Sequence, residues 1–272
     1  MSGAVLMIPD NAFTDRLRVR SYEVGQSGTI GLGTALRYCE ALATDASASV
    51  GFDRSWYEAH HAAWVVREMT ILLGALPRIG EELGLATWVA QFRRVQAQRE
   101  YAIWQTATGR MVARASARWA YCDADRGQLI RIPDAILETM QSPGVASMLE
   151  YRHRQVHRSE ASTAGSSTFF LQAREYEADT QQHVNNCVYA DWLTEAFTQA
   201  TKAAANTHRP AGSRPRFYRI EYMRAAVAGD ALRIETETAP HGTRGIRAQH
   251  SIVDVESNTA VVQAYSEHIR LA

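Results

Sequence analysis

Cysteine, surplus charge and long hydrophobic runs are all scarce in this sequence, and each scarcity excludes a class of protein. The 272 residues include three cysteines, Cys39, Cys122 and Cys187. They are too few and too scattered for a disulfide framework or a zinc site, so we expect a reducing cytoplasm and neither metal nor cofactor. Basic and acidic residues number 29 each, so a net charge of zero gives no reason to expect nucleic acid as a partner.

No hydrophobic run approaches the length of a membrane span, and the first ten residues lack a charged start followed by an apolar core. We therefore expect no membrane span and no signal peptide. The composition is that of a globular protein, with 46% hydrophobic and 21% charged residues. A chain of this length can bury an ordinary core in one large domain or two small ones.

Polar side chains are concentrated in residues 179–186, which read D-T-Q-Q-H-V-N-N. An extended-looking run, 168–173, precedes them, and apolar residues recur at intervals of three and four from Tyr189 to Ala200. The pattern predicts a strand, a polar turn and the start of a helix.

The predicted helix start has the chemistry to hold an acyl carbonyl oxygen, because its first amides lack partners and carry the positive end of the helix. Asp179 and His183 would flank such a site. One carboxylate beside one imidazole can activate water or attack directly, while the amides receive the developing oxyanion. The same residue types are also ordinary capping and turn residues, so spacing alone leaves both interpretations open.

An internal repeat runs through the sequence. The pattern R-x-Y-E occurs at 20–23 and 174–177, and each copy precedes a polar turn and an amphipathic helix. Further on, Gly80-Glu81 parallels Gly229-Asp230, and Thr108-Gly109 parallels Ser257-Asn258, both at a shift of 149. Matching words in the same order predict two copies of one domain.

Each copy reads as a strand, a helix and several antiparallel strands. Apolar residues from Leu32 to Ala46 form a helical stripe, and Ala113–Tyr121 alternates with period two, as a half-buried strand does. Residues 132–140 are predicted to form a short helix that closes the first copy. We expect a first domain at 1–150, a linker at 151–168 and a second domain at 169–272.

The run D-x-x-x-H-V-N-N before an aromatic-bearing helix resembles the active-site segment of hotdog-fold thioesterases. The wider chain, 13–271, resembles the plant and bacterial acyl-carrier-protein thioesterases, with similar words at 64–70, 108–119, 132–134 and 220–222. The resemblance implies an α+β double hotdog fold, in which two tandem domains each wrap a curved antiparallel sheet around a long central helix. It also implies acyl carrier protein or acyl-coenzyme A as the partner, and a monomeric pseudo-dimer or a homodimer.

The resemblance places the site in the second copy. Asp179 matches the family's catalytic carboxylate and His183 its histidine, while Gln181 stands where the family has the shorter Asn. Asn185 and Asn186 are expected to bind substrate. The first copy carries Gly25 and Thr29 at the positions of Asp179 and His183, so its turn is degenerate and we expect that domain to line the acyl tunnel.

The sequence departs from the family after I-E-Y. Where the family commonly has a glutamate and a cysteine, this chain has Ala225 and Ala226. Three functions therefore stay open: a thioesterase, which we favour; a dehydratase or cyclase acting on a carrier-bound acyl or polyketide chain; and a catalytically silent acyl-binding protein.

Overall fold

The structure is a computed structural model, and it describes residues 8–140, 165–205 and 212–270. The chain divides into two compact units. The first is formed by Met1–Ile30, Tyr38–Val66 and Gly74–Glu150, and the second by Gly31–Arg37, Arg67–Leu73 and Tyr151–Ala272.

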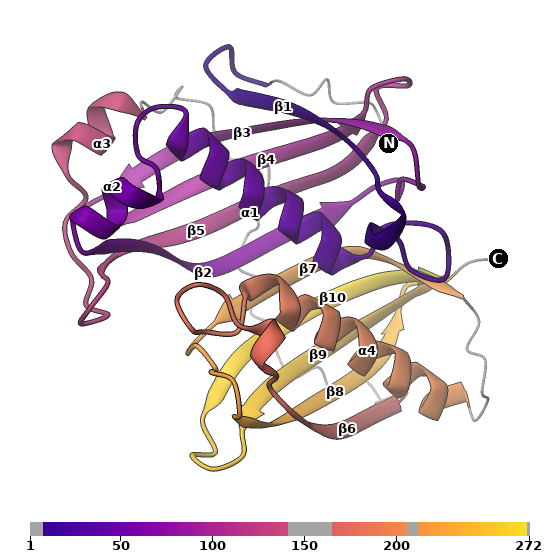
Figure 1. Cartoon of the computed structure of the whole chain (residues 1–272). Helices are drawn as coiled ribbons and strands as arrows, with labels where there is room; N and C mark the ends of the chain where they lie inside the picture. Colours follow the sequence, from indigo (N-terminus) through magenta and orange to yellow (C-terminus); the bar gives the residue numbers. More distant parts are fainter. Residues whose placement is uncertain (1–7, 141–164, 206–211, 271–272) are drawn as a thin grey trace. The chain divides into compact units, whose positions relative to one another are not determined.

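The first unit packs helices against an antiparallel sheet (Figure 1). Four of its strands lie in the order β1-β3-β4-β5, and they are β1 (Phe13–Arg18), β3 (Glu82–Arg93), β4 (Gln96–Gln105) and β5 (Met111–Asp123). The other elements are η1 (Ser21–Glu23), α1 (Leu32–Ala48), α2 (Arg54–Ala59), β2 (Ala62–Leu73) and α3 (Asp134–Thr139). α1 and β2 each contribute residues to both units.

The predicted periodicities of the first unit are confirmed. The apolar stripe from Leu32 to Ala46 lies within α1, and α3 forms inside the range predicted for the closing helix. On β5, Ala113, Ala115 and Ala117 are fully buried whereas Arg118 is exposed. One face of this strand therefore belongs to the core, as alternation with period two requires.

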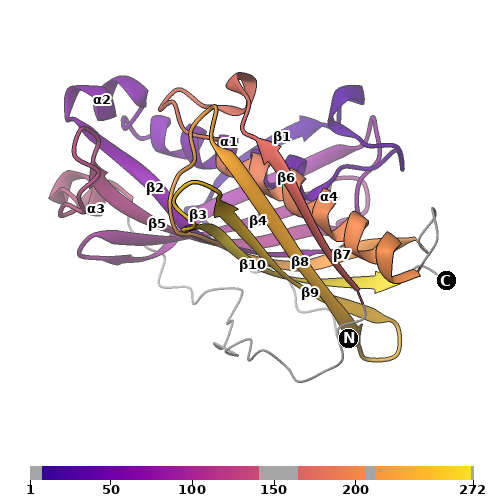
Figure 2. The same ribbon diagram turned by 90° about the horizontal axis from the view of Figure 1, so that it is seen from below.

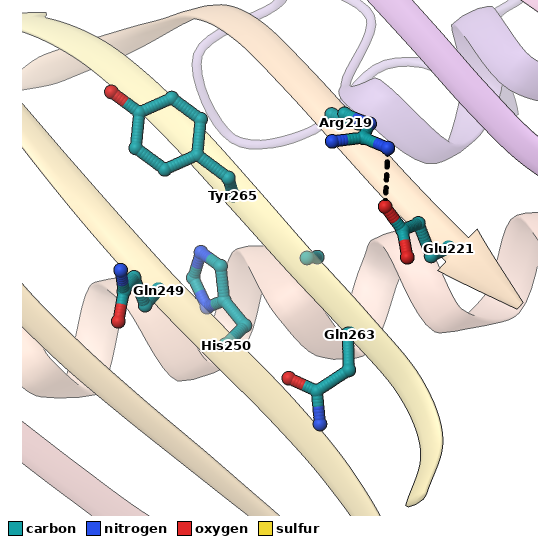
Figure 3. A pocket seen from close by; sticks show the side chains of 7 residues that line it. Arg219, Glu221, Gln249, His250, Gln263 and Tyr265 are labelled. Atoms are coloured by element: carbon teal, nitrogen blue, oxygen red, sulfur yellow. Dashed lines mark ion pairs between the residues drawn. The ribbon is translucent and has the colours of Figure 1, made fainter. Parts of the chain in front are cut away.

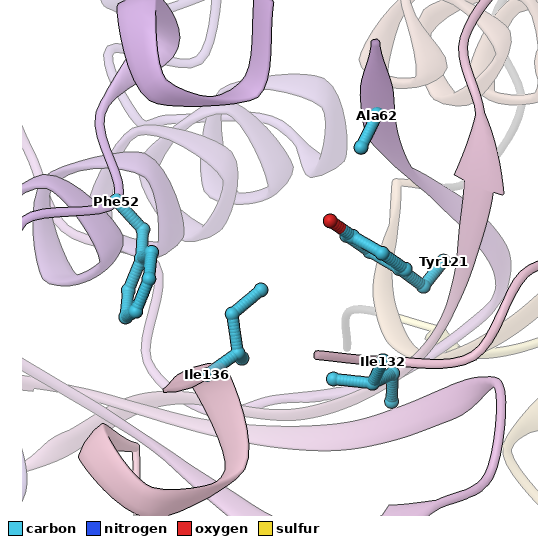
Figure 4. Packing of buried hydrophobic residues seen from close by; sticks show 5 residues of the cluster. All are labelled: Phe52, Ala62, Tyr121, Ile132 and Ile136. Carbon is cyan, nitrogen blue, oxygen red and sulfur yellow. The ribbon is translucent and has the colours of Figure 1, made fainter. Parts of the chain in front are cut away.

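A hydrophobic cluster, called the aromatic cluster below, fills part of the first unit's interior (Figure 4). Its buried members come from the loop before α2, β2, β5, the segment before α3 and α3 itself, namely Phe52, Ala62, Tyr121, Ile132 and Ile136. Partly buried aromatic residues pack around them, namely Trp56, Tyr57, Trp64 and Phe92. Aromatic side chains remove large areas from water, so this cluster contributes strongly to the stability of the unit.

The second unit repeats the arrangement with one long helix. Its strands follow the order β7-β10-β9-β8-β6, and residues Glu68–Leu72 of β2 pair antiparallel with β7. The elements are β6 (Gly165–Gln172), η2 (Glu175–Glu177), α4 (Asn186–Ala205), β7 (Ser213–Tyr222), β8 (Ala231–His241), β9 (Gly245–Asp254) and β10 (Ala260–Arg270). α4 runs along one face of β6 and β8, and Ser167 Oγ donates to Ala196 O at 3.0 Å (Figure 2).

One predicted boundary is wrong. Residues 151–164 lie outside the described part of the chain, but β6 begins at Gly165, inside the range predicted as a linker. Ser and Thr in this stretch read as linker composition. Alternate residues of β6 are nevertheless half-buried and exposed, with Ser166 and Thr168 on the exposed side and Ser167 on the half-buried side, and the strand pairs with β8.

Both copies contain the predicted hairpins. Thr108-Gly109 joins β4 to β5 and Ser257-Asn258 joins β9 to β10, with positive φ angles of 67° at Gly109 and 52° at Asn258. The predicted α+β arrangement of two hotdog copies is thereby confirmed. Along the described ranges, none of the helices combines the length and apolar character needed to cross a bilayer.

Candidate active site

Residues Asp179–His183 form a tight turn between η2 and α4. The amide of Asp179 donates to the carbonyl oxygen of His183 at 2.8 Å, and the amide of Gln182 donates to that of Asp179 at 3.0 Å. The turn therefore brings Asp179 and His183 next to each other, as the sequence predicts.

The connection that follows β7 lies against this turn. The amide of Val184 donates to the carbonyl oxygen of Ala226 at 2.8 Å, and His183 forms a β-bridge with Val227. Ala226 is fully buried, whereas Ala225 is exposed. The positions at which the resemblance places a missing glutamate and cysteine therefore border the predicted catalytic turn.

The two candidate catalytic side chains are accessible. Oδ1 of Asp179 accepts a hydrogen bond from the amide of Gln181 at 2.8 Å, which fixes the carboxylate's orientation. Its other oxygen has no protein partner among the residues that the structure describes. His183 and Gln181 are exposed, and Asp179 is half-buried. The site thus presents one held carboxylate, with a free oxygen, beside one solvent-accessible imidazole.

The start of α4 offers fewer free amides than its sequence suggests. Among the backbone amides of residues 184–188, that of Asn186 has no protein acceptor within the described residues. The others donate internally: Val184 to Ala226, Asn185 to Glu177, and both Cys187 and Val188 to Asn185. The predicted group of exposed amides is therefore reduced to a single donor, because capping satisfies the rest.

The two candidate substrate-binding residues have different surroundings. Oδ1 of Asn185 accepts from the amide of Cys187 at 2.8 Å, so this side chain caps α4. Asn186 is the first residue of α4, and its carbonyl oxygen accepts from the hydroxyl of Tyr222 at 3.3 Å. Asn185 is thus engaged in local structure, and Asn186 has the better-placed backbone for a ligand.

Tyr189 is a site residue that the sequence reasoning used only as part of an apolar stripe. Its buried hydroxyl accepts a hydrogen bond from the amide of Ala226 at 3.0 Å, which ties α4 to the connection after β7. Burial raises the pKa of this phenol to about 12, so it stays protonated at neutral pH. The first copy has Ala35 at the equivalent position, and that contrast was visible in the sequence.

Glu177 supports the turn from the side of η2. This buried carboxylate accepts from the amide of Arg174 at 2.8 Å and from Nε1 of Trp192 at 3.3 Å. The first copy has an equivalent pair of hydrogen bonds, since Glu23 accepts from the amide of Arg20 at 2.6 Å and from the hydroxyl of Tyr38 at 2.9 Å. Both copies therefore position their turns in the same way.

The turn of the first copy has the same backbone and different side chains. The amide of Gly25 donates to Thr29 O at 3.0 Å, that of Gly28 to Gly25 O at 2.9 Å, and that of Ile30 to Pro77 O at 3.1 Å. These bonds match those of the second copy one for one. Gly25 therefore occupies the backbone position of Asp179, and Thr29 that of His183, so of these two turns the second carries an acid and an imidazole and the first does not.

Gln182 adopts a backbone conformation that favours glycine. Its φ angle is 62°, and the equivalent Gly28 has a φ of 71°. A side chain in the left-handed region strains the backbone, so Gln182→Gly is expected to raise the free energy of unfolding by about 0.5–1 kcal/mol. The reciprocal Gly28→Gln change should lower it by a similar amount. Urea unfolding of both variants checks this, and a loss of stability in Gln182→Gly would contradict it.

A shallow polar hollow lies elsewhere in the second unit, over β7, β9 and β10 (Figure 3). Arg219 and Glu221 form an ion pair at its rim, and Gln249, Gln263 and Tyr265 also line it. None of the predicted site residues contributes to it. In the part of the chain that the structure covers, no group of three or more His, Cys, Asp or Glu side chains could hold a metal ion.

Comparisons with known proteins agree with the duplicated architecture. The model of the acyl-ACP thioesterase N-terminal domain matches residues 10–140, and that of the C-terminal domain matches residues 160–269. An acyl-carrier-protein hydrolase of Cuphea viscosissima, named as chloroplastic, is 28% identical over 193 residues, covering 68% of this chain and 47% of that protein. The chain thus spans about half the length of the curated relative.

Solved structures show the same fold. A structure from Lactobacillus plantarum has a TM-score of 0.82 at 19% identity, covering 98% of this chain and all of its own. A 12:0-ACP thioesterase from Umbellularia californica has a TM-score of 0.77 at 19% identity, covering 96% of this chain and 94% of its own. The similarity therefore extends over both hotdog copies.

Proposed function

Because the chain belongs to the acyl-ACP thioesterase family, we propose that it hydrolyses an acyl thioester carried by an acyl carrier protein, releasing the free acid and the carrier thiol. One observation carries this proposal. Two turns have the same backbone hydrogen bonds, and only the second presents a carboxylate and an imidazole, Asp179 and His183. A turn that served folding alone would not require these two side chains, as the first copy demonstrates.

The geometry supports attack by water on the thioester carbonyl carbon. The free oxygen of Asp179 takes a proton from the water as its oxygen forms the new bond. The oxyanion of the tetrahedral intermediate accepts a hydrogen bond from the amide of Asn186, at the positive end of α4. The C–S bond then breaks, and the departing thiolate gains a proton from the exposed imidazole of His183 or from water.

Supporting residues hold this arrangement in place. The hydrogen bond between Tyr189 and Ala226 fixes the connection after β7 against α4, and the amide of Val184 joins the same connection to the turn. Gln181 lies within the turn, and its amide orients the Asp179 carboxylate. We assign Gln181 to positioning of the water or the thioester carbonyl, a role for which an exposed amide side chain is suited.

We assign the acyl group to the first hotdog copy. Its helix α1 carries small residues where α4 has large ones, since Ala35 and Ala43 are equivalent to Tyr189 and Phe197. Phe197 stacks on His268 with ring centroids 3.4 Å apart and thereby fills the second unit's interior. The aromatic cluster of Figure 4 would then limit how far the acyl chain extends.

The absence of a glutamate after β7 makes a gain-of-function test available. Ala225 is exposed and borders the turn through Ala226, so Ala225→Glu should add a second carboxylate near the turn. We expect turnover to rise by about tenfold, which is less than the roughly hundredfold that a fully positioned general base contributes. Steady-state hydrolysis rates check this. Ala225→Gln is the matched control and should leave turnover unchanged; equal rates for both variants would contradict a carboxylate role at this position.

The activity itself is tested by following products. The purified chain is incubated with acyl-carrier-protein and acyl-coenzyme A thioesters, and thiol release is measured beside the mass of the acyl product. Release of thiol and free acid supports the proposal. A change of acyl mass without thiol release would instead indicate dehydration or cyclisation, and binding without either would indicate a silent acyl-binding protein.

We propose the cytoplasm as the setting of this reaction. Cys39, Cys122 and Cys187 are buried thiols, which suits a reducing compartment. Buried thiols of this kind pack as small apolar groups, and burial raises the pKa of Cys39 to about 12. Thiol titration of the native and the unfolded protein tests the assignment, since a disulfide in the native chain would contradict it.

A further inference from the structure

Arg99 is a buried positive charge that the proposed mechanism does not use. It lies on β4 in the first unit, and 9% of the residue is exposed. Burial lowers its pKa, yet a guanidinium keeps its proton in proteins, so the charge remains at neutral pH. Buried charges are normally paired, because an unpaired charge away from water is strongly unfavourable.

The partners of Arg99 inside the protein are weak. One terminal nitrogen reaches Oγ1 of Thr87 at 3.4 Å and the other reaches Sδ of Met140 at 4.0 Å. Both contacts are long, and a thioether is a poor acceptor. No ion pair found among the described residues includes Arg99. Within the part of the chain that the structure describes, a strong acceptor for its five N–H groups is therefore lacking.

The nearest phenols are already engaged. The hydroxyl of Tyr57 bonds to that of Ser47 at 2.9 Å and accepts from Nε1 of Trp64 at 3.0 Å. The hydroxyl of Tyr101 accepts from Nε1 of Trp119 at 3.3 Å. None of these hydroxyl contacts includes the guanidinium of Arg99.

A small part of Arg99 remains exposed to solvent. Its Nε makes none of the hydrogen bonds found among the described residues, and it does not belong to the fully buried nitrogen atoms that lack a partner. The exposed fraction of the whole residue is 9%. Met140, which Arg99 contacts, packs against the aromatic cluster of Figure 4.

The fold itself does not require an arginine here. Arg99 pairs with Val89 on β3 and Ala117 on β5. In the second unit the same register position, 149 residues later, is Ala248, which pairs with Thr238 and Ser266. Since alanine occupies the equivalent position in the second copy, the fold does not depend on a charge there, and Arg99 is a specific feature of the first copy.

We propose that Arg99 recognises an oxygen function on the acyl group, and that the accepted substrate is a carboxy- or hydroxyacyl thioester. The inference rests on the proposed thioesterase function and adds the class of acyl chain. A planar guanidinium donates two parallel hydrogen bonds to a carboxylate and one or two to a hydroxyl oxygen. A plain alkyl chain would leave the charge unpaired beside an apolar group, which disfavours its binding.

Arg99→Met tests this recognition, since methionine keeps length and removes the charge. Rates are compared between saturated acyl thioesters of a series of chain lengths and matched thioesters that end in a carboxyl or hydroxyl group. The native chain should prefer the carboxyacyl series by about ten- to a hundredfold in kcat/KM, and Arg99→Met should lose that preference. Arg93→Met, at an exposed arginine of β3, is the matched control and should keep it.

Thermal unfolding separates recognition from a structural role. Removing an unpaired buried charge should leave the Tm of Arg99→Met unchanged or higher. A lower Tm with an equal loss of rate on both substrate series would show that Arg99 serves the fold and would overturn the inference, as would equal rates of the native chain on both series.

Binding measurements keep the test independent of turnover. Tryptophan fluorescence follows the binding of carboxyacyl- and alkyl-coenzyme A thioesters to the native chain and to Arg99→Met. If neither thioester is hydrolysed, the proposed activity fails, while selective carboxyacyl binding that depends on Arg99 still supports the recognition site. Equal affinities of both proteins for both ligands overturn it.

Discussion

Asp179→Asn is expected to lower turnover by about a hundredfold or more. The substitution keeps the shape of the side chain, and its Oδ1 can still accept from the amide of Gln181, so the turn should persist. What is lost is the negative charge on the oxygen that has no protein partner. A neutral amide neither takes a proton from water nor attacks a thioester, so the rate falls by the full contribution of general-base catalysis.

A matched variant separates this loss from a general effect of Asp-to-Asn changes. Asp123 plays the same local part in the hairpin after β5, where Oδ1 accepts from the amides of Asp125 at 3.0 Å and Arg126 at 2.8 Å. Asp123→Asn should retain turnover. Thiol release from an acyl-carrier-protein thioester is the measurement for both, and near-normal turnover by Asp179→Asn would remove that carboxylate from the mechanism.

Pre-steady-state kinetics distinguish the two ways in which Asp179 could act. A base acts on the transition state more than on the bound thioester, so kcat should fall while KM changes little. If the carboxylate attacked the carbonyl directly, an acyl-enzyme would accumulate in the native protein and rapid-quench measurements would show a burst of thiol. Its absence favours activation of water.

Much of the fold was predictable because the chain repeats itself. The two R-x-Y-E motifs form η1 and η2. In both copies the glutamate accepts a hydrogen bond from the backbone amide of the residue three positions before it. Local patterns of this kind depend on a few neighbouring residues, so spacing alone reveals them. The start of β6 was missed because Ser and Thr suit a strand's exposed face as well as a linker, and its pairing with β8 decides between them.

The candidate site was predictable in its residues and less so in its geometry. Asp179 and His183 lie together because one short turn contains both. The sequence predicted amides at the helix start but did not single out that of Asn186, since this depends on which neighbours satisfy the other donors. It did not identify the hydroxyl of Tyr189, because the partner Ala226 comes from a distant segment. Aligning the two copies and comparing them position by position would have identified Tyr189, because the first copy has Ala35 at the equivalent position.

Arg99 could not be recognised as a buried residue from the sequence. An arginine in an alternating strand reads as a residue of the exposed face, and β5 has such a residue in Arg118. In β4 both faces are buried, since the neighbouring residues Arg99 and Glu100 are each covered. Which faces of a strand are covered depends on the elements that pack on it, and one sequence states this only indirectly.

Acid should destabilise this protein steeply, because two histidines are buried in the second unit. His250 bonds to Thr236 Oγ1 at 2.9 Å and to Ser266 Oγ at 2.9 Å, and His268 bonds to Ser266 Oγ at 3.0 Å. Tyr218 OH lies 3.2 Å from His268, and Phe197 of α4 stacks on the same ring. The partners found around these rings are thus neutral, and none stabilises an imidazolium.

Burial lowers the pKa of both histidines to about 3, with the neighbouring His250 lowering that of His268 further. In the unfolded chain both should titrate near the ordinary value of about 6.5. Above that pH neither state binds the protons, and stability is unaffected. As the pH falls below it, the unfolded state binds two protons that the folded state excludes, so the free energy of unfolding falls by about 1.4 kcal/mol per pH unit for each histidine.

His250→Asn is expected to remove about half of this pH dependence. The slope of the unfolding free energy is measured by urea denaturation between about pH 6.5 and pH 5, above the range in which ordinary carboxylates titrate. The slope isolates titration, because any loss of packing in the variant lowers stability at every pH alike. Gln249→Asn, at the neighbouring position of β9, is the matched control and should keep the native slope, because it removes no titrating group. Equal slopes for the native chain and His250→Asn would show that this imidazole becomes charged inside the folded protein, and the polar interior of the second unit would then admit water or a counter-ion.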